Sequence, residues 1–252
     1  KRMKTRFLNK MAGLLAVLLL FSCTGKFEEY NTDNTGFTDE QKTHDYTMFG
    51  GWLKVVQMGI YFNYDWGSGK NWHFQTMQNL NADMFSGYMH DFKPFNAGLG
   101  NTVYNLQDGW NGTLWDNTYG YIMTEIKQTE DHSRDKYPAF YAIAKILKVE
   151  VMHRISDYYG PIVYTKFGES DAGVMPDSQK DAYYAFFRDL GEAIHLLSEY
   201  DGEETLSRFD MIIPANPRTF REWMRFANSL RLRLAIRIAM GDPDKARDEA
   251  HK

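Results

Sequence analysis

The sequence has a single cysteine, Cys23, among its 252 residues. A disulfide needs two cysteines, so no internal disulfide can form, even in an oxidising compartment. The seven histidines are scattered along the chain and show neither an HExxH motif nor another paired metal-ligand spacing. The sequence therefore predicts no disulfide framework, no metal site and no cofactor.

The chain also lacks the short motifs that mark common enzyme sites. Gly67-Ser68-Gly69 does not have the outer glycines of a nucleophile elbow. Gly69-Lys70 has no glycine five residues before it, so it is not a phosphate-binding loop. The 33 acidic residues could include a glycosidase pair, but nothing in their spacing selects one. We therefore expect a protein that is not an enzyme, with a glycoside hydrolase as the less favoured alternative.

No apolar run is long enough for a stable membrane-spanning helix. The run Met11–Phe21 follows a basic segment, which is typical of a secretory signal peptide. The next residues complete Leu20-Phe21-Ser22-Cys23, which resembles a bacterial lipobox; the alternative is an ordinary signal peptide with an incidental cysteine. We predict a signal peptide over residues 1–22, lipidation of Cys23 and a polar tether over residues 23–45. Acyl chains on Cys23 would anchor the protein to a membrane without spanning it.

The chain has no excess of positive charge, with 29 Lys and Arg residues against 33 Asp and Glu residues. Its formal net charge is −4, and several of its basic residues lie in the predicted signal peptide. The mature protein would therefore be more acidic still, which argues against nucleic acid as a partner.

Most of the remaining chain has helical periodicity, because apolar residues recur at three- and four-residue steps. No strand-length alternating run and no βαβ rhythm competes with this pattern. The predicted helices cover residues 46–61, 74–85, 114–130, 138–159, 178–200, 219–241 and 243–252. Short turns join several of them into pairs. We therefore predict a mainly α domain over residues 46–252, with tetratricopeptide-like helix pairs forming an α-superhelical scaffold with long ordered loops.

An aromatic, asparagine-rich region between residues 62 and 110 is the candidate binding surface. Sugar rings present C–H faces that stack on tryptophan and tyrosine, and sugar hydroxyl groups need amide and carboxylate partners. The candidate ligand-binding residues are Trp66, Trp72, Asn81, Asp83, Tyr88 and Trp110. The alternative is that these rings hold long loops against the helices.

Three segments together resemble the SusD/RagB family of outer-membrane lipoproteins. Asp157-Tyr158-Tyr159-Gly160-Pro161-Ile162 looks like the turn that follows a central helix in that family, although many members have Asp and Val before the proline. Residues 188–197 are similar to its "DL.eAi..L" helix, and residues 227–237 to its "NSLrLRLA.R" helix. With the lipobox, the resemblance covers most of residues 23–252. Members are considerably longer, so we expect the domain to be incomplete at its C-terminal end.

The resemblance implies a cell-surface lipoprotein of the outer membrane that binds an oligosaccharide, or sometimes a peptide. It also implies a partner, a SusC-like TonB-dependent transporter that takes up the captured nutrient. The alternative to this function is a helical-repeat interaction scaffold at the outer membrane without a small ligand of its own.

Overall fold

The computed structural model describes residue 26 and residues 46–61, 72–93, 96–200, 206–213 and 220–252. The chain separates into two units, Lys1–Asp45 and Tyr46–Lys252. The predicted signal peptide, Cys23 and, apart from Lys26, the tether lie outside the described residues. Within the described part, no helix combines the length and the apolar character needed to cross a membrane.

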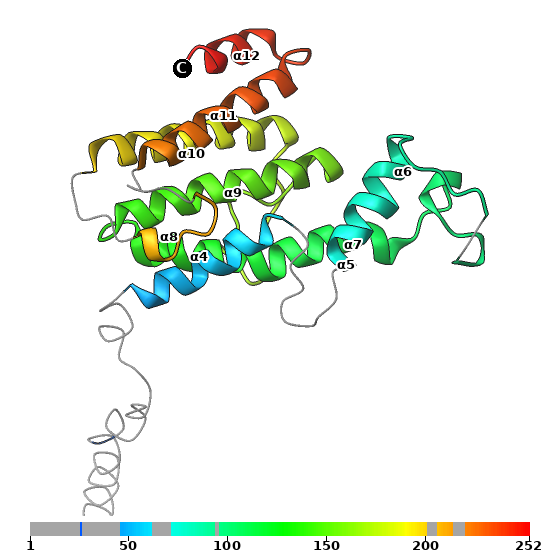
Figure 1. Cartoon of the computed structure of the whole chain (residues 1–252), viewed down its shortest axis with the longest axis horizontal. Helices are drawn as coiled ribbons and strands as arrows, with labels where there is room; N and C mark the ends of the chain where they lie inside the picture. Colours follow the sequence, from blue (N-terminus) through cyan, green and yellow to red (C-terminus); the bar gives the residue numbers. More distant parts are fainter. Residues whose placement is uncertain (1–25, 27–45, 62–71, 94–95, 201–205, 214–219) are drawn as a thin grey trace, which may run out of the picture. The chain divides into compact units, whose positions relative to one another are not determined.

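The unit Tyr46–Lys252 is mainly α, as predicted. Its described residues form no strand and only isolated bridges, such as that between Ile162 and Asp177. The helix predicted over residues 138–159 is observed with the same bounds, and those predicted near both ends of the unit and over residues 178–200 are observed with slightly shorter bounds (Figure 1). They are α4 (Thr47–Gly59), α9 (Pro138–Tyr159), α10 (Gln179–Glu199), α11 (Phe220–Ile238) and α12 (Pro243–Ala250).

The helix predicted over residues 114–130 is longer than expected at both ends. It consists of α7 (Asp108–Asn117), the π-helical segment η4 (Thr118–Met123) and α8 (Thr124–Ser133). At its C-terminal end the hydroxyl groups of Thr129 and Ser133 donate to the carbonyl groups four residues earlier. The two polar side chains are thus satisfied inside the helix, and the turn before α9 is shorter than the sequence predicts.

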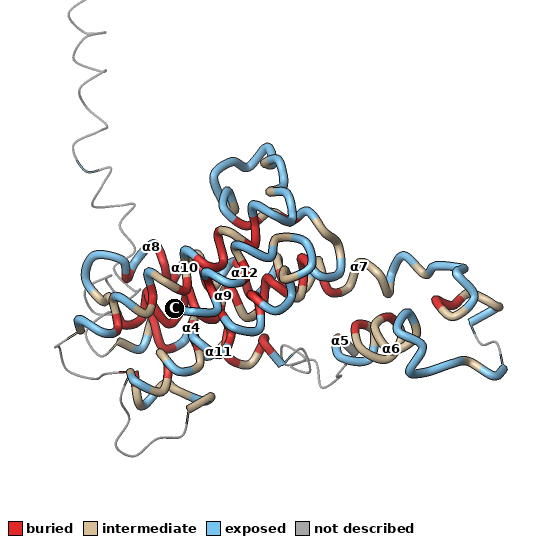
Figure 2. Tube along the Cα trace, turned by 90° about the horizontal axis from the view of Figure 1, so that it is seen from above, coloured by how far each residue is buried: buried red, intermediate tan, exposed pale blue. Residues whose placement is uncertain are grey.

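Helix α9 is the centre of the helical stack. Its buried residues lie all round the helix, which is the pattern of a helix covered on every side. It contacts α4, α8, α10 and α11, and Figure 1 shows it between α8 and α10. Figure 2 shows the buried residues concentrated along α9 and these neighbours. The successive pairs α8–α9 and α10–α11 form the predicted helix-pair scaffold.

Helix α9 ends at Gly160, whose backbone has φ 78° and ψ −104°. Residues with a Cβ atom rarely adopt this conformation, so glycine is required to turn the chain here. Pro161 follows, and Ile162 then pairs with Asp177 across the intervening loop. The extended residues return the chain to the core, where the side chain of Tyr164 is 1% exposed.

Ser178 and Asp242 are capping residue types placed just before two of the predicted helices, and both caps are observed. The Ser178 side chain accepts a hydrogen bond from the backbone N–H of Asp181 at 3.1 Å. The Asp242 side chain accepts one from the N–H of Lys245 at 3.2 Å, with Pro243 in the first turn of α12. Both satisfy backbone donors that a helix leaves unpaired at its start. Thr219 and Glu222 have the spacing of a capping box at the start of α11, and Thr219 lies outside the described residues.

Candidate functional site

The aromatic region of the sequence folds into a loop lobe, which we define as residues 72–93 and 96–117. Its first part is one helical run made of α5 (Trp72–Phe74), the π-helical η1 (Gln75–Ala82) and α6 (Asp83–Phe85). Short 3-10 turns, η2 (Asn96–Gly98) and η3 (Asn101–Val103), lead into α7. The run packs against α7, and Figure 1 shows the lobe beside the helical stack.

Asparagine side chains form the interior of the lobe. Asn101 is 2% exposed, and its amide nitrogen lies 2.5 Å from Oδ1 of Asn81 and 2.6 Å from the carbonyl oxygen of Leu80. The Asn81 amide in turn donates to the carbonyl groups of Thr76 and Trp110. These bonds connect η1, η3 and α7, so polar pairing helps to hold the lobe together beside the buried apolar residues Met77 and Leu114.

The outer surface of the lobe carries large apolar and aromatic side chains exposed to solvent. Tyr88 is 88% exposed, Phe92 is 95% exposed and Tyr104 is 83% exposed. Large apolar side chains exposed together in one lobe favour a site that a ligand or a partner covers. The further exposed apolar residues of the lobe are Phe74, Phe85, Met89, Val103 and Leu106.

Tyr104 has an unusual backbone as well as an exposed ring. Its φ is 55° in the left-handed region, which a residue with a Cβ atom rarely adopts. The turn around it is closed by a bridge in which Gly100 and Asn105 exchange backbone hydrogen bonds. A left-handed residue held in a closed turn is typical of sites where the fold fixes the direction of a side chain.

The lobe is attached to the stack by the end of α9. The hydroxyl group of Tyr158 donates to the carbonyl of Met77 in η1, and that of Tyr159 donates to the carbonyl of Asn111 in α7. Burial raises the pKa of Tyr158 to about 12, so this hydroxyl keeps its proton at neutral pH and remains a donor. Within the stack, Arg154 of α9 donates a hydrogen bond of 3.0 Å to the carbonyl of Ile60 at the end of α4.

The predicted site residues have different positions in the lobe. Trp66 lies outside the described residues, and Trp72 begins α5 but its side chain is not described. Tyr88 lies at the surface, and Trp110 is half-buried in the first turn of α7. These positions do not test whether the side chains contact a ligand. Ligand binding by the four aromatic residues therefore stays a prediction.

The two polar candidates are already hydrogen-bonded inside the lobe. Asn81 is 3% exposed and is part of the asparagine interior. The carboxylate of Asp83 is half-buried and accepts from the side-chain amides of Gln78 at 2.6 Å and Asn79 at 3.1 Å. Their described contacts position η1, and their predicted contact with a ligand also stays a prediction.

Tyr104 and Phe92 are not among the residues predicted from the sequence. The available signal for Tyr104 was the run Gly100-Asn101-Thr102-Val103-Tyr104-Asn105, an aromatic residue within a glycine- and asparagine-containing turn. Phe92 had no comparable signal, because a single aromatic residue in a loop is as consistent with packing as with exposure. Among the described residues, no group of three or more His, Cys, Asp or Glu side chains could hold a metal ion.

A family model described as SusD-like, "Susd and RagB outer membrane lipoprotein", matches residues 29–252. The chain belongs to the SusD-like family. No curated protein sequence matches this chain. The mainly α architecture and the resemblance read from the sequence are therefore confirmed.

Solved structures of SusD-like proteins show the same fold. A SusD homologue from Bacteroides vulgatus is 45% identical, with a TM-score of 0.73 over 83% of this chain and 42% of its own. A chitin-binding SusD homologue from Flavobacterium johnsoniae is 38% identical, with a TM-score of 0.72 over 80% of this chain and 41% of its own. A third, from Bacteroides uniformis, is 30% identical, with a TM-score of 0.62. This chain thus spans less than half the length of the SusD-like structures that it matches.

Proposed function

We propose that this SusD-like protein binds an oligosaccharide, or a peptide, at the cell surface and delivers it to a SusC-like TonB-dependent transporter. It is anchored in the outer membrane through lipidated Cys23. Binding without catalysis is proposed because SusD-like proteins are binding proteins rather than enzymes. The family match over residues 29–252 supports the proposal, together with the similarity to a chitin-binding SusD homologue.

The observation that carries the choice of ligand class is the exposed aromatic surface of the loop lobe. Tyr88 and Tyr104 expose almost the whole of their side chains, although such rings usually avoid water in a folded protein. A sugar ring can cover a tyrosine face with its C–H groups, while its hydroxyl groups bond to polar side chains of the same lobe, such as Asn79 and Asp83. The asparagine interior and the α9 tyrosines hold this surface in place before a ligand arrives.

Calorimetric titration of the full-length lipid-free protein tests this proposal. Chitooligosaccharides are the first ligands to try, followed by a panel of plant and host glycans and short peptides. The variants Trp66→Ala, Trp72→Ala, Tyr88→Ala and Tyr104→Ala each remove one ring. We expect loss of a stacking ring to weaken binding roughly tenfold, which corresponds to about 1.4 kcal/mol.

Met175→Ala is the matched control, because Met175 is an exposed apolar residue outside the lobe. Unchanged affinity in all four ring variants would remove the lobe from the binding site. Binding to a transporter barrel without binding to any glycan or peptide would favour the interaction scaffold. Release of reducing ends from a polysaccharide by the purified protein would support a hydrolase instead.

A further inference from the structure

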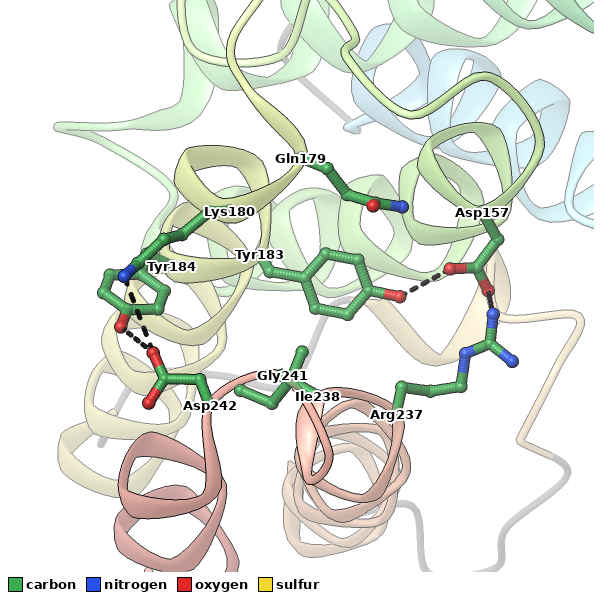
Figure 3. A pocket seen from close by; sticks show the side chains of 9 residues that line it. All are labelled: Asp157, Gln179, Lys180, Tyr183, Tyr184, Arg237, Ile238, Gly241 and Asp242. Atoms are coloured by element: carbon green, nitrogen blue, oxygen red, sulfur yellow. Dashed lines mark hydrogen bonds and ion pairs between the residues drawn. The ribbon is translucent and has the colours of Figure 1, made fainter.

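A polar pocket of about 400 Å³ lies where α9 ends, α10 begins and α11 turns into α12 (Figure 3). It is lined by Asp157, Gln179, Lys180, Tyr183, Tyr184, Arg237, Ile238, Gly241 and Asp242. No residue of the loop lobe is among them. The volume is within the range of pockets that hold small molecules.

One end of the pocket is formed around the carboxylate of Asp157. The hydroxyl of Tyr183 donates to Oδ1 at 2.6 Å, and the guanidinium of Arg237 lies 2.7 Å from Oδ2. Figure 3 shows this group on one side of the cavity, with Arg237 reaching across from α11. The aromatic ring of Tyr183 is buried, so its hydroxyl position is fixed by packing.

The other end repeats the same chemistry around Asp242. Its Oδ2 accepts from the hydroxyl of Tyr184 at 2.5 Å and lies 3.7 Å from the ammonium of Lys180. Its Oδ1 accepts from the N–H of Lys245 and caps α12. The hydrogen bond from Tyr184 lowers the pKa of Asp242 below its ordinary value, so the carboxylate is ionised at neutral pH.

The cavity is therefore electrically balanced and rich in hydrogen-bonding groups. Asp157 and Asp242 offset Arg237 and Lys180, so neither an anion nor a cation gains net charge attraction. A carboxylate has about four lone-pair positions and a guanidinium has five N–H groups, so the bonds described above leave capacity at both ends. Ile238 and Gly241 complete the wall without adding polar atoms (Figure 3).

We propose that this pocket is a second binding site that takes one neutral sugar residue through hydrogen bonds. A hydroxyl group both donates and accepts, so a polyhydroxylated ring can bond to carboxylate oxygen and to cationic N–H without separating the existing pairs. Ring stacking contributes little here. The Tyr183 ring is buried, and the ammonium groups of Lys180 and Lys245 lie 5.3 Å and 5.1 Å from the centre of the Tyr184 ring.

The choice of a carbohydrate ligand rests on the proposed function; the location of the site does not. A zwitterionic amino acid is the competing ligand, because it could bond to an acid and a base at the same time. Its two charged groups would lose their hydration on entering the pocket, yet Arg237 and Asp157 already neutralise each other at 2.7 Å and offer no net charge to offset that cost. For this reason the neutral ring is favoured.

The test uses full-length protein labelled with ¹³C in the isoleucine δ1 methyl groups. The Ile238 resonance, assigned with Ile238→Val, reports on the pocket itself. Neutral monosaccharides such as N-acetylglucosamine and glucose are titrated into the protein, followed by alanine and acetate. We expect the Ile238 resonance to shift with a neutral sugar and to saturate in the millimolar range.

Gly241→Phe fills the pocket without removing any described side-chain bond, because a Cβ at Gly241 meets no atom closer than 3.8 Å. We expect it to abolish the sugar-dependent shift of the Ile238 resonance, which this variant retains. Gly51→Phe is the matched control, since a Cβ there meets nothing within 4 Å and Gly51 lies in α4. Lys180→Met is a second, milder variant on an exposed side chain, expected to weaken binding roughly fivefold.

The outcomes separate the pocket from the function proposed for the lobe. If glycans bind the protein but leave Ile238 unchanged, or if both Gly241→Phe and Lys180→Met bind normally, the pocket is not a sugar site and the lobe proposal is unaffected. A shift produced by alanine or acetate alone overturns the ligand class. If no sugar, glycan or peptide binds anywhere, both proposals are wrong, whereas binding of a peptide alone overturns only the sugar site in the pocket.

Discussion

The hydroxyl group of Tyr158, in the last turn of α9, donates a hydrogen bond to the backbone carbonyl of Met77 in the loop lobe. Tyr159 makes the equivalent bond to Asn111, and Asp157 forms one end of the polar pocket. Three successive side chains at the end of the central helix thus reach the lobe and the pocket. The turn at Gly160 then returns the chain to the core, so this segment connects the scaffold to both candidate sites.

Replacing Tyr158 with phenylalanine should loosen the lobe while leaving the stack folded. The ring remains, but the hydrogen bond to the Met77 carbonyl is lost, which costs about 1 kcal/mol. Hydrogen exchange measured by mass spectrometry should be faster in residues 72–85 than in the wild-type protein. Tyr88→Phe removes a hydroxyl from an exposed ring in the same lobe and should leave exchange unchanged. Equal exchange in both variants would contradict the attachment role.

The neighbouring glycines of α4 should respond in opposite directions to alanine. A Cβ at Gly50 would lie 2.1 Å from the ring of Phe209, so Gly50→Ala forces the ring to move and should destabilise the protein by about 1–3 kcal/mol. A Cβ at Gly51 meets nothing, so Gly51→Ala should stabilise the helix by about 0.5–1 kcal/mol. Urea unfolding of both variants measures the difference. Equal effects would mean that Gly50 is not a close-packing position.

Stability should fall as the pH falls from about 6.5 towards 4, because of His153. Burial lowers its pKa from 6.5 to about 4, with Arg154 and Arg233 acting in the same direction and Asp157 opposing them. In this range the unfolded chain binds a proton that the folded protein does not, so protonation favours unfolding. The resulting loss in the free energy of unfolding is about 3 kcal/mol in total, and it is complete only below pH 4.

Urea unfolding at pH 7.5, 5.5 and 4.5 measures this pH dependence, with His153→Gln as the test variant. We expect the variant to lose most of the change in unfolding free energy over that range. The control is His195→Gln, because the His195 side chain is 65% exposed and should keep the wild-type pH dependence. If His153→Gln kept the wild-type pH dependence of the unfolding free energy, another titrating group would be responsible for it.

Removing only one partner of the ion pair between Lys145 and Asp189 should strongly lower the free energy of unfolding. The two side chains are 9% and 16% exposed and lie 2.8 Å apart, and the Tyr164 hydroxyl also donates to Asp189. Burial by itself would lower the pKa of Lys145, but the Asp189 carboxylate raises it above its ordinary value. Lys145→Met leaves a buried carboxylate without its cation and should cost about 3 kcal/mol.

A double-mutant cycle with Asp189→Leu separates the pair from the desolvation of each partner. The double variant should recover much of the loss, because it removes both buried charges. Lys127→Met breaks the exposed pair with Asp131 and should cost at most about 0.5 kcal/mol. A loss of stability in the double variant equal to the sum of the two single losses would contradict coupling between Lys145 and Asp189.

Much of the helical architecture can be predicted from local pattern. The apolar periodicity that predicts a helix over residues 46–61 places Phe49, Leu53 and Val56 on one face, and all three are buried there. The caps at Ser178 and Asp242 were found because a capping side chain bonds to a backbone group only a few residues away. The predicted helix ends at residue 130, whereas α8 continues to Ser133. Thr129 and Ser133 also suit turns, but here their hydroxyl groups donate to carbonyl groups inside the helix.

The candidate sites were less predictable than the helices. Asn81 and Tyr88 belong to the same loop-rich segment of the sequence, yet one is 3% exposed and the other 88%. The difference depends on contacts with Asn101 and with the α7 backbone, which are distant in sequence. The pocket likewise requires α9, α10 and α11 to meet, so Asp157 and Asp242 have no shared local signal.

The sequence by itself determined the helices, their caps and the family to which this chain belongs. These depend on apolar spacing, on backbone groups within one turn and on the order of recognisable segments. Only the tertiary structure decided which polar residues are interior, which aromatic rings face solvent and where a cavity remains. Those properties come from side chains far apart in the chain, such as Tyr158 against Met77, and a local pattern does not contain them.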